Sequence, residues 1–221
     1  GQSLFQRLFD DMRPESPFRP DADSAGRRAL RNSALSYLTY AERSPELAAA
    51  AFGSADNMTD LLQALTLLAH RFPETEQAAG ALFSFLERFD ANPLVIDKWF
   101  AVQATIPGAA TLDRVKALME DRHFVRGNPN RVRALVGSFA FSNPTGFNRT
   151  DGEGYRFLAE QILAIDPKNP QLAARLLTSM RSWRSLEPQR ADLARSALLT
   201  IDRSAALSND VRDIVERMLK G

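Results

Sequence analysis

The stretch NPNRVRALVGSFAFSNPTGF, residues 128–147, indicates how this chain folds. It begins with Asn128-Pro129 and then repeats apolar residues at three- and four-residue spacing, which is the period of an α-helix. Proline at the first helical position presets the backbone dihedral, and the asparagine before it can accept hydrogen bonds from the unpaired N–H groups of the first turn. The stretch therefore predicts a helix that begins at Pro129.

The same start occurs twice more, at Asn92-Pro93 and Asn169-Pro170. Successive prolines are 36 and 41 residues apart, a spacing found in repeats of helical hairpins. Between these starts lie helical patterns with other openings, TLDRVKALME at 111–120 and TDGEGYRFLAEQILAI at 150–165. In the second, Thr150 and Glu153 have the spacing of a capping box. Each repeat is thus predicted to be a pair of helices.

Apolar residues recur with helical period almost everywhere, and alternation of period two is not sustained. The predicted fold class is all-α: a superhelical stack of antiparallel helix pairs, an α-solenoid of the HEAT or armadillo kind, in which each pair buries its apolar stripe against its neighbours. We expect one helical repeat domain over residues 1–221. The only long loop, rich in proline and aspartate, is predicted at residues 13–26.

The composition excludes several classes of protein. The chain has 221 residues, of which 44% are apolar, enough to bury a core. Its 28 basic and 27 acidic residues give a net charge of +1 and are interspersed, so we expect no nucleic-acid partner. The absence of cysteine excludes disulfides and fits a reducing compartment. No apolar run is long enough to cross a membrane, and the expected location is the cytoplasm.

Residues that carry chemistry are scarce. The two histidines, His70 and His123, are far apart and lie in no His-Glu-x-x-His motif, so we expect structural or solvated roles and no metal site. The sequence GEG at 152–154 lacks the features of a phosphate-binding loop and is interpreted as a loose first helical turn. On its own residues, the chain is not expected to be an enzyme or to bind a cofactor.

Two helices present polar side chains opposite or beside their apolar stripes. In the helix after Pro129, the stripe comprises Val132, Leu135, Val136 and Phe139, and at about 100° per residue Arg131 and Arg133 lie on opposite flanks of it. The helix after Pro170 has its stripe at Leu172, Leu176 and Met180. Gln171 and Arg175 lie one turn apart on its far side, which leaves that face free for a partner or a ligand.

Four blocks of sequence carry a family resemblance: GRRALRN (26–32), NMTD (57–60), DKWFAVQA (97–104) and NPNRVRALVGSF (128–139). In this order they resemble the C-terminal domain of bacterial aminopeptidase N, an alanyl aminopeptidase of the gluzincin class. The resemblance implies that the parent protein is a zinc metallopeptidase that removes N-terminal residues from peptides. Because the zinc helix and the amine-binding loop of the family are absent here, the chain is expected to be a non-catalytic C-terminal piece. A start at Gly1 that leads directly into a helical pattern fits such a piece.

In the family the helical domain packs over the catalytic domain and closes the active site into a chamber. The resemblance therefore implies that Arg133, Gln171 and Arg175 border the peptide route, that the catalytic domain of the same polypeptide and peptide substrates are the partners, and that zinc lies in that catalytic domain. Candidates for the interdomain interface are the arginines Arg27, Arg28, Arg31 and Arg131; Arg131 is interpreted as a structural staple. Trp99 and Phe100 are expected in the core.

A second hypothesis is a free-standing solenoid adaptor that binds a protein or peptide on its concave face. A free solenoid needs a polar helix at its end, whereas Leu4, Phe5, Leu8 and Phe9 are bulky and apolar. This favours the interpretation as one domain of a larger enzyme.

Overall fold

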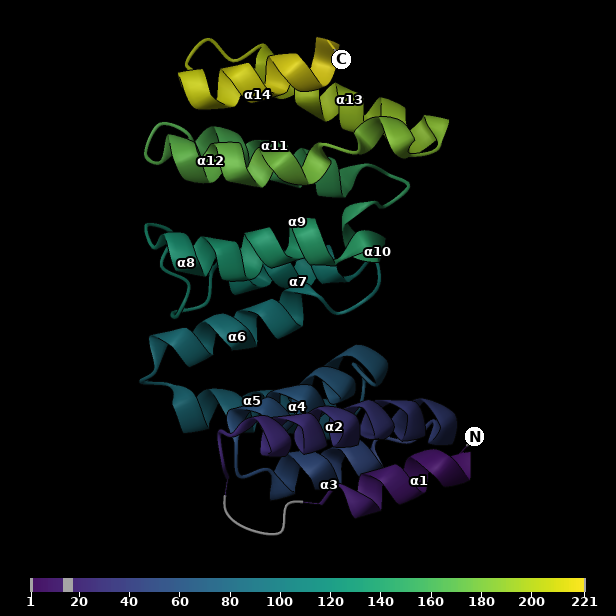
Figure 1. Cartoon of the computed structure of the whole chain (residues 1–221). Coiled ribbons are helices and arrows are strands. Elements are labelled where there is room, and N and C mark those ends of the chain that lie inside the picture. The colour runs from purple at the N-terminus through teal and green to yellow at the C-terminus, as the bar shows by residue number, and fades with distance from the viewer. Residues whose placement is uncertain (1, 14–17, 221) are drawn as a thin grey trace. The chain divides into compact units, whose positions relative to one another are not determined.

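A computed structural model describes residues 2–13 and 18–220 (Figure 1). Within these residues the regular structure is helical and contains no strand, which confirms the predicted all-α class. The chain forms two compact units, residues 1–102 and 103–221. Each consists of helices packed on their neighbours in sequence. The single repeat domain over residues 1–221 stays a prediction.

The first unit contains five complete helices and most of a sixth. They are α1 (Gln2–Asp11), α2 (Ala22–Glu42), α3 (Glu46–Ser54), α4 (Met58–Arg71), α5 (Glu76–Phe89) and α6 (Pro93–Ala104), whose last two residues belong to the second unit. Helix α1 packs on α2, and α4 packs on α2, α3 and α5. The helical period of the apolar residues in this part of the sequence therefore corresponds to helices.

The loop predicted at residues 13–26 extends too far, because helix α2 begins inside it, at Ala22. Helix α2 begins at Ala22 because Asp21 caps it: the Asp21 carboxylate accepts a hydrogen bond from the Ser24 backbone N–H at 2.9 Å. The aspartates of this segment were interpreted as loop residues, yet one of them is a helix cap. Residues 14–17 of the predicted loop lie outside the described part of the chain.

The second unit contains the remaining helices. They are α7 (Thr111–Leu118), α8 (Pro129–Val132), the π-helix η1 (Arg133–Gly137), α9 (Ser138–Ser142), α10 (Pro144–Phe147), α11 (Glu153–Ile165), α12 (Pro170–Leu177), the 3-10 helices η2 (Thr178–Met180) and η3 (Trp183–Ser185), α13 (Pro188–Asp202) and α14 (Asn209–Lys220). Helix α12 packs on α11 and α14, and α13 packs on both α11 and α14. These pairings give the layers of Figure 1 for this unit.

The three predicted Asn-Pro starts are confirmed. The side-chain oxygen of Asn128 accepts from the Asn130 backbone N–H at 2.9 Å, and that of Asn169 accepts from Leu172 at 3.0 Å. The Asn92 side chain accepts from the Val95 N–H at 3.3 Å. A fourth start of the same kind opens the short α10, where the last Asn-Pro of the quoted stretch lies.

The predicted capping box at Thr150 and Glu153 is wrong. Helix α11 is preceded by Gly152, whose φ of +72° is left-handed, and the first turn is capped from Asp151, whose carboxylate accepts from the Glu153 N–H at 3.1 Å. Glycine adopts this conformation without the steric cost that a Cβ would bring. The GEG sequence is therefore a tightly specified start and not a loose turn.

The predicted apolar stripes form the core. Val132, Leu135, Val136 and Phe139 are all buried, as are Leu172, Leu176 and Met180. In the first unit Trp99 and Phe100 are buried as predicted, and the Trp99 indole N–H donates to the Leu82 carbonyl at 3.0 Å. A buried indole needs such a partner because an unpaired N–H would cost free energy.

Candidate functional site

Arg133 lies where the helix that starts at Pro129 changes its winding. From Arg133 to Gly137 the backbone forms a π-helical turn, and the Ser138 N–H donates to the Arg133 carbonyl five residues earlier. Such single π-turns widen the helix and are frequent at functional sites. The Arg133 side chain is exposed, and its guanidinium donates to the Asn130 side-chain oxygen at 3.0 Å. Asn130 thus orients Arg133 without neutralising it.

Gln171 and Arg175 lie on the exposed side of α12, as predicted. The Arg175 guanidinium carbon lies 5.8 Å from the centre of the Phe141 ring, within the range of a cation–π contact. Phe141 belongs to α9 and is 47% exposed, which is high for a phenylalanine. This contact joins α9 to α12 at the surface.

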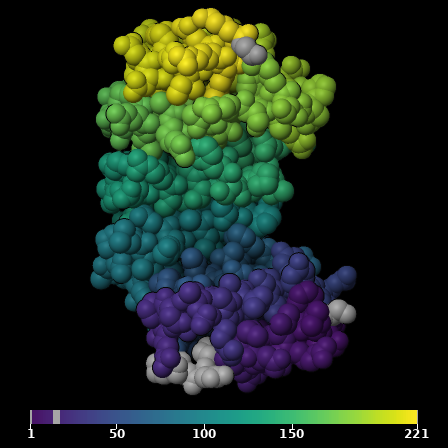
Figure 2. Space-filling model, viewed as in Figure 1, coloured from purple at the N-terminus to yellow at the C-terminus, as the bar shows by residue number. Residues whose placement is uncertain are grey.

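Gly137 shows that the two helices approach closely. A Cβ at this position would lie 3.7 Å from the Leu176 Cδ2 and 3.8 Å from the Arg133 Cβ. Gly137, one turn after Arg133, therefore packs on α12, the helix that carries Gln171 and Arg175. In Figure 2 the surfaces of α8–α9 and of α12 are adjacent. We name the surface formed by Arg133, Phe141, Gln171 and Arg175 the arginine face.

The arginine face carries positive charge that the chain itself does not cancel. Within residues 2–13 and 18–220, neither Arg133 nor Arg175 forms an ion pair with a carboxylate. A guanidinium held by an amide or an aromatic ring keeps its capacity for a bidentate pair with a carboxylate or for hydrogen bonds to carbonyl groups. The face can thus bind an extended peptide backbone or a C-terminal carboxylate.

Arg131 differs from Arg133, as expected from their positions on opposite flanks of the stripe. Its exposed fraction is 5%, so the side chain is buried within the second unit. This burial supports the interpretation as a staple. It argues against Arg131 as an interdomain contact, because almost none of its surface is accessible to another domain.

The other interface candidates contact the N-terminal segment of the chain. Arg27 donates to the Asp11 carbonyl at 2.9 Å, and Arg28 donates to the Arg19 carbonyl at 2.9 Å. The Arg31 guanidinium carbon lies 4.3 Å from the centre of the Phe9 ring. Arg27 and Arg31 therefore both face α1 or the residue that ends it. Their role between domains stays a prediction.

Neither histidine belongs to a metal site in the part of the chain that the structure describes, where no cluster of three or more metal-ligating side chains occurs. A ring nitrogen of His70 lies 2.9 Å from the Val102 carbonyl oxygen, and burial lowers the pKa of this histidine more than that hydrogen bond raises it. His123 lies 2.7 Å from an Asp121 oxygen. Among the described helices, none is both long and apolar enough to cross a membrane.

Comparison with known proteins assigns the fold to a family. A family model described as "Domain of unknown function (DUF3458_C) ARM repeats" matches residues 1–220. The chain belongs to the DUF3458_C family. Membership confirms the predicted α-solenoid class, since ARM repeats stack helices in this way.

Relatives of this DUF3458_C chain include two bacterial proteins named aminopeptidase N. The one from Caulobacter vibrioides is 42% identical over 220 residues, which cover 98% of this chain and 25% of the relative. The one from Escherichia coli is 35% identical over 208 residues, covering 93% and 24%. The chain thus spans about a quarter of the length of these relatives and matches a C-terminal portion, which confirms the resemblance indicated by the four sequence blocks.

A solved structure has the same fold. Legionella pneumophila aminopeptidase A, determined in complex with aspartic acid, matches 99% of this chain with 26% of its own, at a TM-score of 0.87 and 32% identity. The similarity covers both units of the DUF3458_C chain.

Two features of the arginine face, Phe141 and the π-turn, were not predicted from the sequence. Phe141 is two residues after the buried Phe139, which places it about 200° around the helix from the apolar stripe, and this position could have marked it as exposed. The π-turn had no such signal, because its residues read as an ordinary helix.

Proposed function

We propose that the chain is the non-catalytic C-terminal domain of an aminopeptidase that removes N-terminal residues from peptides. In this proposal it covers the active-site chamber and lines the route by which peptides reach it. The observation that carries the proposal is the arginine face, two guanidinium groups and an amide on adjacent helices with no carboxylate paired to them. The similarity to aminopeptidases over a quarter of their length supports it.

The proposed role is positioning. Arg133 and Arg175 bind carbonyl groups or the C-terminal carboxylate of the peptide, and Gln171 donates or accepts a hydrogen bond between them. Phe141 fixes the Arg175 side chain, so less side-chain entropy is lost when a peptide binds. Contacts of this kind act on residues beyond the scissile bond.

Zinc and the catalytic residues belong, in this proposal, to the catalytic domain of the same polypeptide. In the described part of this chain, no three or more metal-ligating side chains cluster together. The cytoplasmic location stays a prediction.

The test is steady-state kinetics of the full-length parent enzyme with Arg133→Ala and Arg175→Ala. We expect each substitution to raise the KM for a tetrapeptide about tenfold, the value of one charge-assisted hydrogen bond, and to leave the KM for a single-residue amide within about twofold. Arg195→Ala is the matched control, since Arg195 is exposed on α13, away from the arginine face.

Equal effects on both substrates would reject the role in peptide positioning. Under the adaptor hypothesis, the substitutions would leave all peptidase kinetics unchanged and weaken binding of a protein partner instead.

A further inference from the structure

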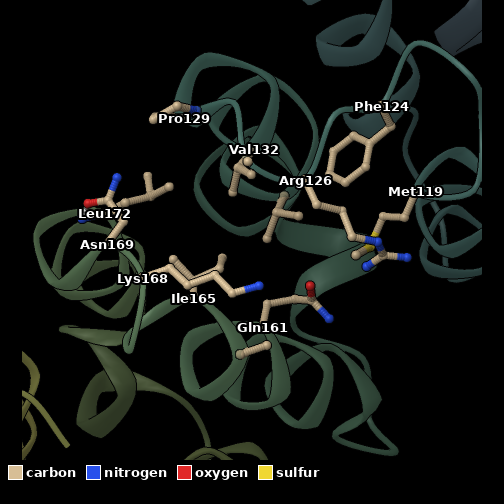
Figure 3. A pocket seen from close by; sticks show the side chains of 13 residues that line it. Met119, Phe124, Arg126, Pro129, Val132, Gln161, Ile165, Lys168, Asn169 and Leu172 are labelled. Atoms are coloured by element: carbon tan, nitrogen blue, oxygen red, sulfur yellow. Dashed lines mark hydrogen bonds between the residues drawn. The ribbon is translucent and has the colours of Figure 1, made fainter.

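A pocket separate from the arginine face lies in the second unit, between the turn that precedes α8 and the junction of α11 with α12 (Figure 3). Its volume is about 240 Å³. The walls are mainly apolar and include Met119, Phe124, Val132, Val136, Ile165 and Leu172. None of Arg133, Gln171 or Arg175 lines it.

Three polar side chains of this pocket, Arg126, Gln161 and Lys168, lie on one side of it, whereas Asn169 lies at the other end beside Leu172. Figure 3 shows the Lys168 side chain extending with its amine toward the amide of Gln161, while the Arg126 guanidinium approaches Gln161 from the opposite wall. The apolar walls lie next to this cluster. The pocket thus combines an apolar body with a polar, cationic side.

The charge at this side is positive. The lining residues contain Arg126 and Lys168 and no aspartate or glutamate. Arg126 pairs with Glu120, and both side chains are largely exposed, so that pair is weak and open to competition. Within residues 2–13 and 18–220, Lys168 forms no ion pair. An ammonium beside an apolar cavity, with no anion of its own, favours an anionic ligand.

We propose that this pocket binds a small apolar carboxylate, with the apolar part between Val132, Ile165 and Leu172 and the carboxylate on Lys168 and Gln161. The volume corresponds to about eight water molecules at ~30 Å³ each, which fits a single apolar side chain or a short acyl chain and is smaller than a drug-sized site. Two sources share this chemistry: the C-terminal residue of a peptide and a short fatty acid.

The test is calorimetric titration of the full 221-residue chain with octanoate and, as neutral and cationic counterparts, octan-1-ol and octylammonium. We expect octanoate to bind about tenfold more tightly than octanol, because the carboxylate gains a charge-assisted hydrogen bond, and octylammonium to bind most weakly. N-acetyl-leucine and N-acetyl-leucinamide form the second arm. Tighter binding of N-acetyl-leucine than of octanoate identifies a peptide C-terminus as the source, and the reverse order identifies a fatty acid.

Two substitutions locate the binding. Lys168→Met keeps the length of the side chain and removes its charge, so we expect it to weaken octanoate about tenfold and to leave octanol unchanged. Ala164→Phe, at an exposed position of the lining, fills the pocket and should abolish both. Lys220→Met in α14 is the control, since Lys220 pairs with Glu216 and does not line the pocket.

Three results would overturn the proposal: no binding of either carboxylate, equal affinity for octanoate and octanol, or unchanged octanoate affinity in Lys168→Met. The proposal does not depend on the peptidase function, because each of these measurements uses the isolated chain and no substrate turnover.

Discussion

At the scale of single residues, Gly154 shows how closely the first turn of α11 packs against the end of α10. A Cβ at this position would lie 2.1 Å from the carbonyl oxygen of Phe147, far inside van der Waals contact. Gly154 therefore lets α11 approach α10. The sequence GEG was interpreted as a loose first turn, and nothing in its pattern indicated that α10 and α11 approach so closely at Gly154.

We expect Gly154→Ala to destabilise the chain by about 3 kcal/mol, because the backbone of α10 or α11 must move. Gly80→Ala is the matched control. Gly80 lies inside α5 with no atom within 4 Å of an added Cβ, so alanine should stabilise the chain by about 0.5–1 kcal/mol through helix propensity. Thermal unfolding followed by circular dichroism measures both, and similar melting temperatures for the two variants would contradict the assignment.

His70 provides a test of pH dependence. Because burial lowers its pKa in the folded chain, the unfolded chain takes up the proton first as the pH falls below about 6.5. The unfolding free energy therefore has its full value with respect to His70 above that pH, and it decreases as the pH falls toward the pKa of His70 in the folded chain. The loss has a slope of at most about 1.4 kcal/mol per pH unit for one proton.

Urea unfolding between pH 7.5 and 5.5 measures this effect. The difference in unfolding free energy between the wild type and His70→Gln should change with pH in the direction given, whereas His123 remains in both proteins and cancels. Parallel curves would show that His70 has the same pKa in both states.

At the scale of elements, the Asn-Pro starts explain where helices begin. One of these asparagines, Asn143, also hydrogen-bonds to backbone far from its own helix. It is 1% exposed, and its amide donates to the Ala104 carbonyl at 3.0 Å and the Ile106 carbonyl at 2.7 Å. Its oxygen accepts from the Gly146 N–H at 2.8 Å. One side chain thus caps α10 and satisfies two carbonyl groups that are distant in sequence.

Asn143→Ala should cost about 3 kcal/mol, because it removes a cap and two buried hydrogen bonds, those to the Ala104 and Ile106 carbonyls. The Ile106 carbonyl keeps its bond from the Thr111 hydroxyl at 2.6 Å. Asn169→Ala removes only a cap and should cost about 1 kcal/mol. For a chain of this size, the melting temperatures should fall by about 6–12 °C and 2–4 °C, respectively. Equal losses would mean that the bonds to Ala104 and Ile106 contribute nothing.

The elements also show what the sequence could predict. Asn caps and apolar stripes are local signals, and they placed the helices and the buried faces at 128–139 and 169–180 correctly. The errors occurred where more than one nearby residue could cap a helix. Asp21 caps α2, which was expected to start later in the chain. Asp151, and not Thr150, caps the first turn of α11. The π-turn at 133–137 was not predicted, because the apolar period of these residues is that of an ordinary α-helix.

At the scale of the whole molecule, the chain is a DUF3458_C domain of ARM repeats whose second unit carries both the arginine face and the pocket lined by Lys168. The arginine face presents cations on adjacent helices, and its three predicted members, Arg133, Gln171 and Arg175, are all exposed there. Helical wheels could predict their exposure, and the family resemblance suggested their role. The contact of Arg175 with Phe141 and the close approach of Gly137 to α12 required the structure, because these residues lie on different helices.

The pocket lined by Lys168 could not have been found from the sequence. Its walls come from several turns and helices between Met119 and Leu172, and each apolar residue, taken alone, has the pattern of an ordinary core residue. A site of this kind depends on how consecutive repeats pack, which is a property of the stack and not of any single helix.

The central claim is that this chain positions peptides for a catalytic centre elsewhere in the polypeptide. The most direct measurement is kcat/KM of the full-length parent enzyme carrying Arg133→Ala and Arg175→Ala together, with substrates from a single-residue amide to a tetrapeptide. We predict that kcat/KM falls by tenfold or more for the tetrapeptide and by less than about twofold for the amide, with intermediate losses between. A loss that does not depend on substrate length, or no loss with the tetrapeptide, would contradict the account.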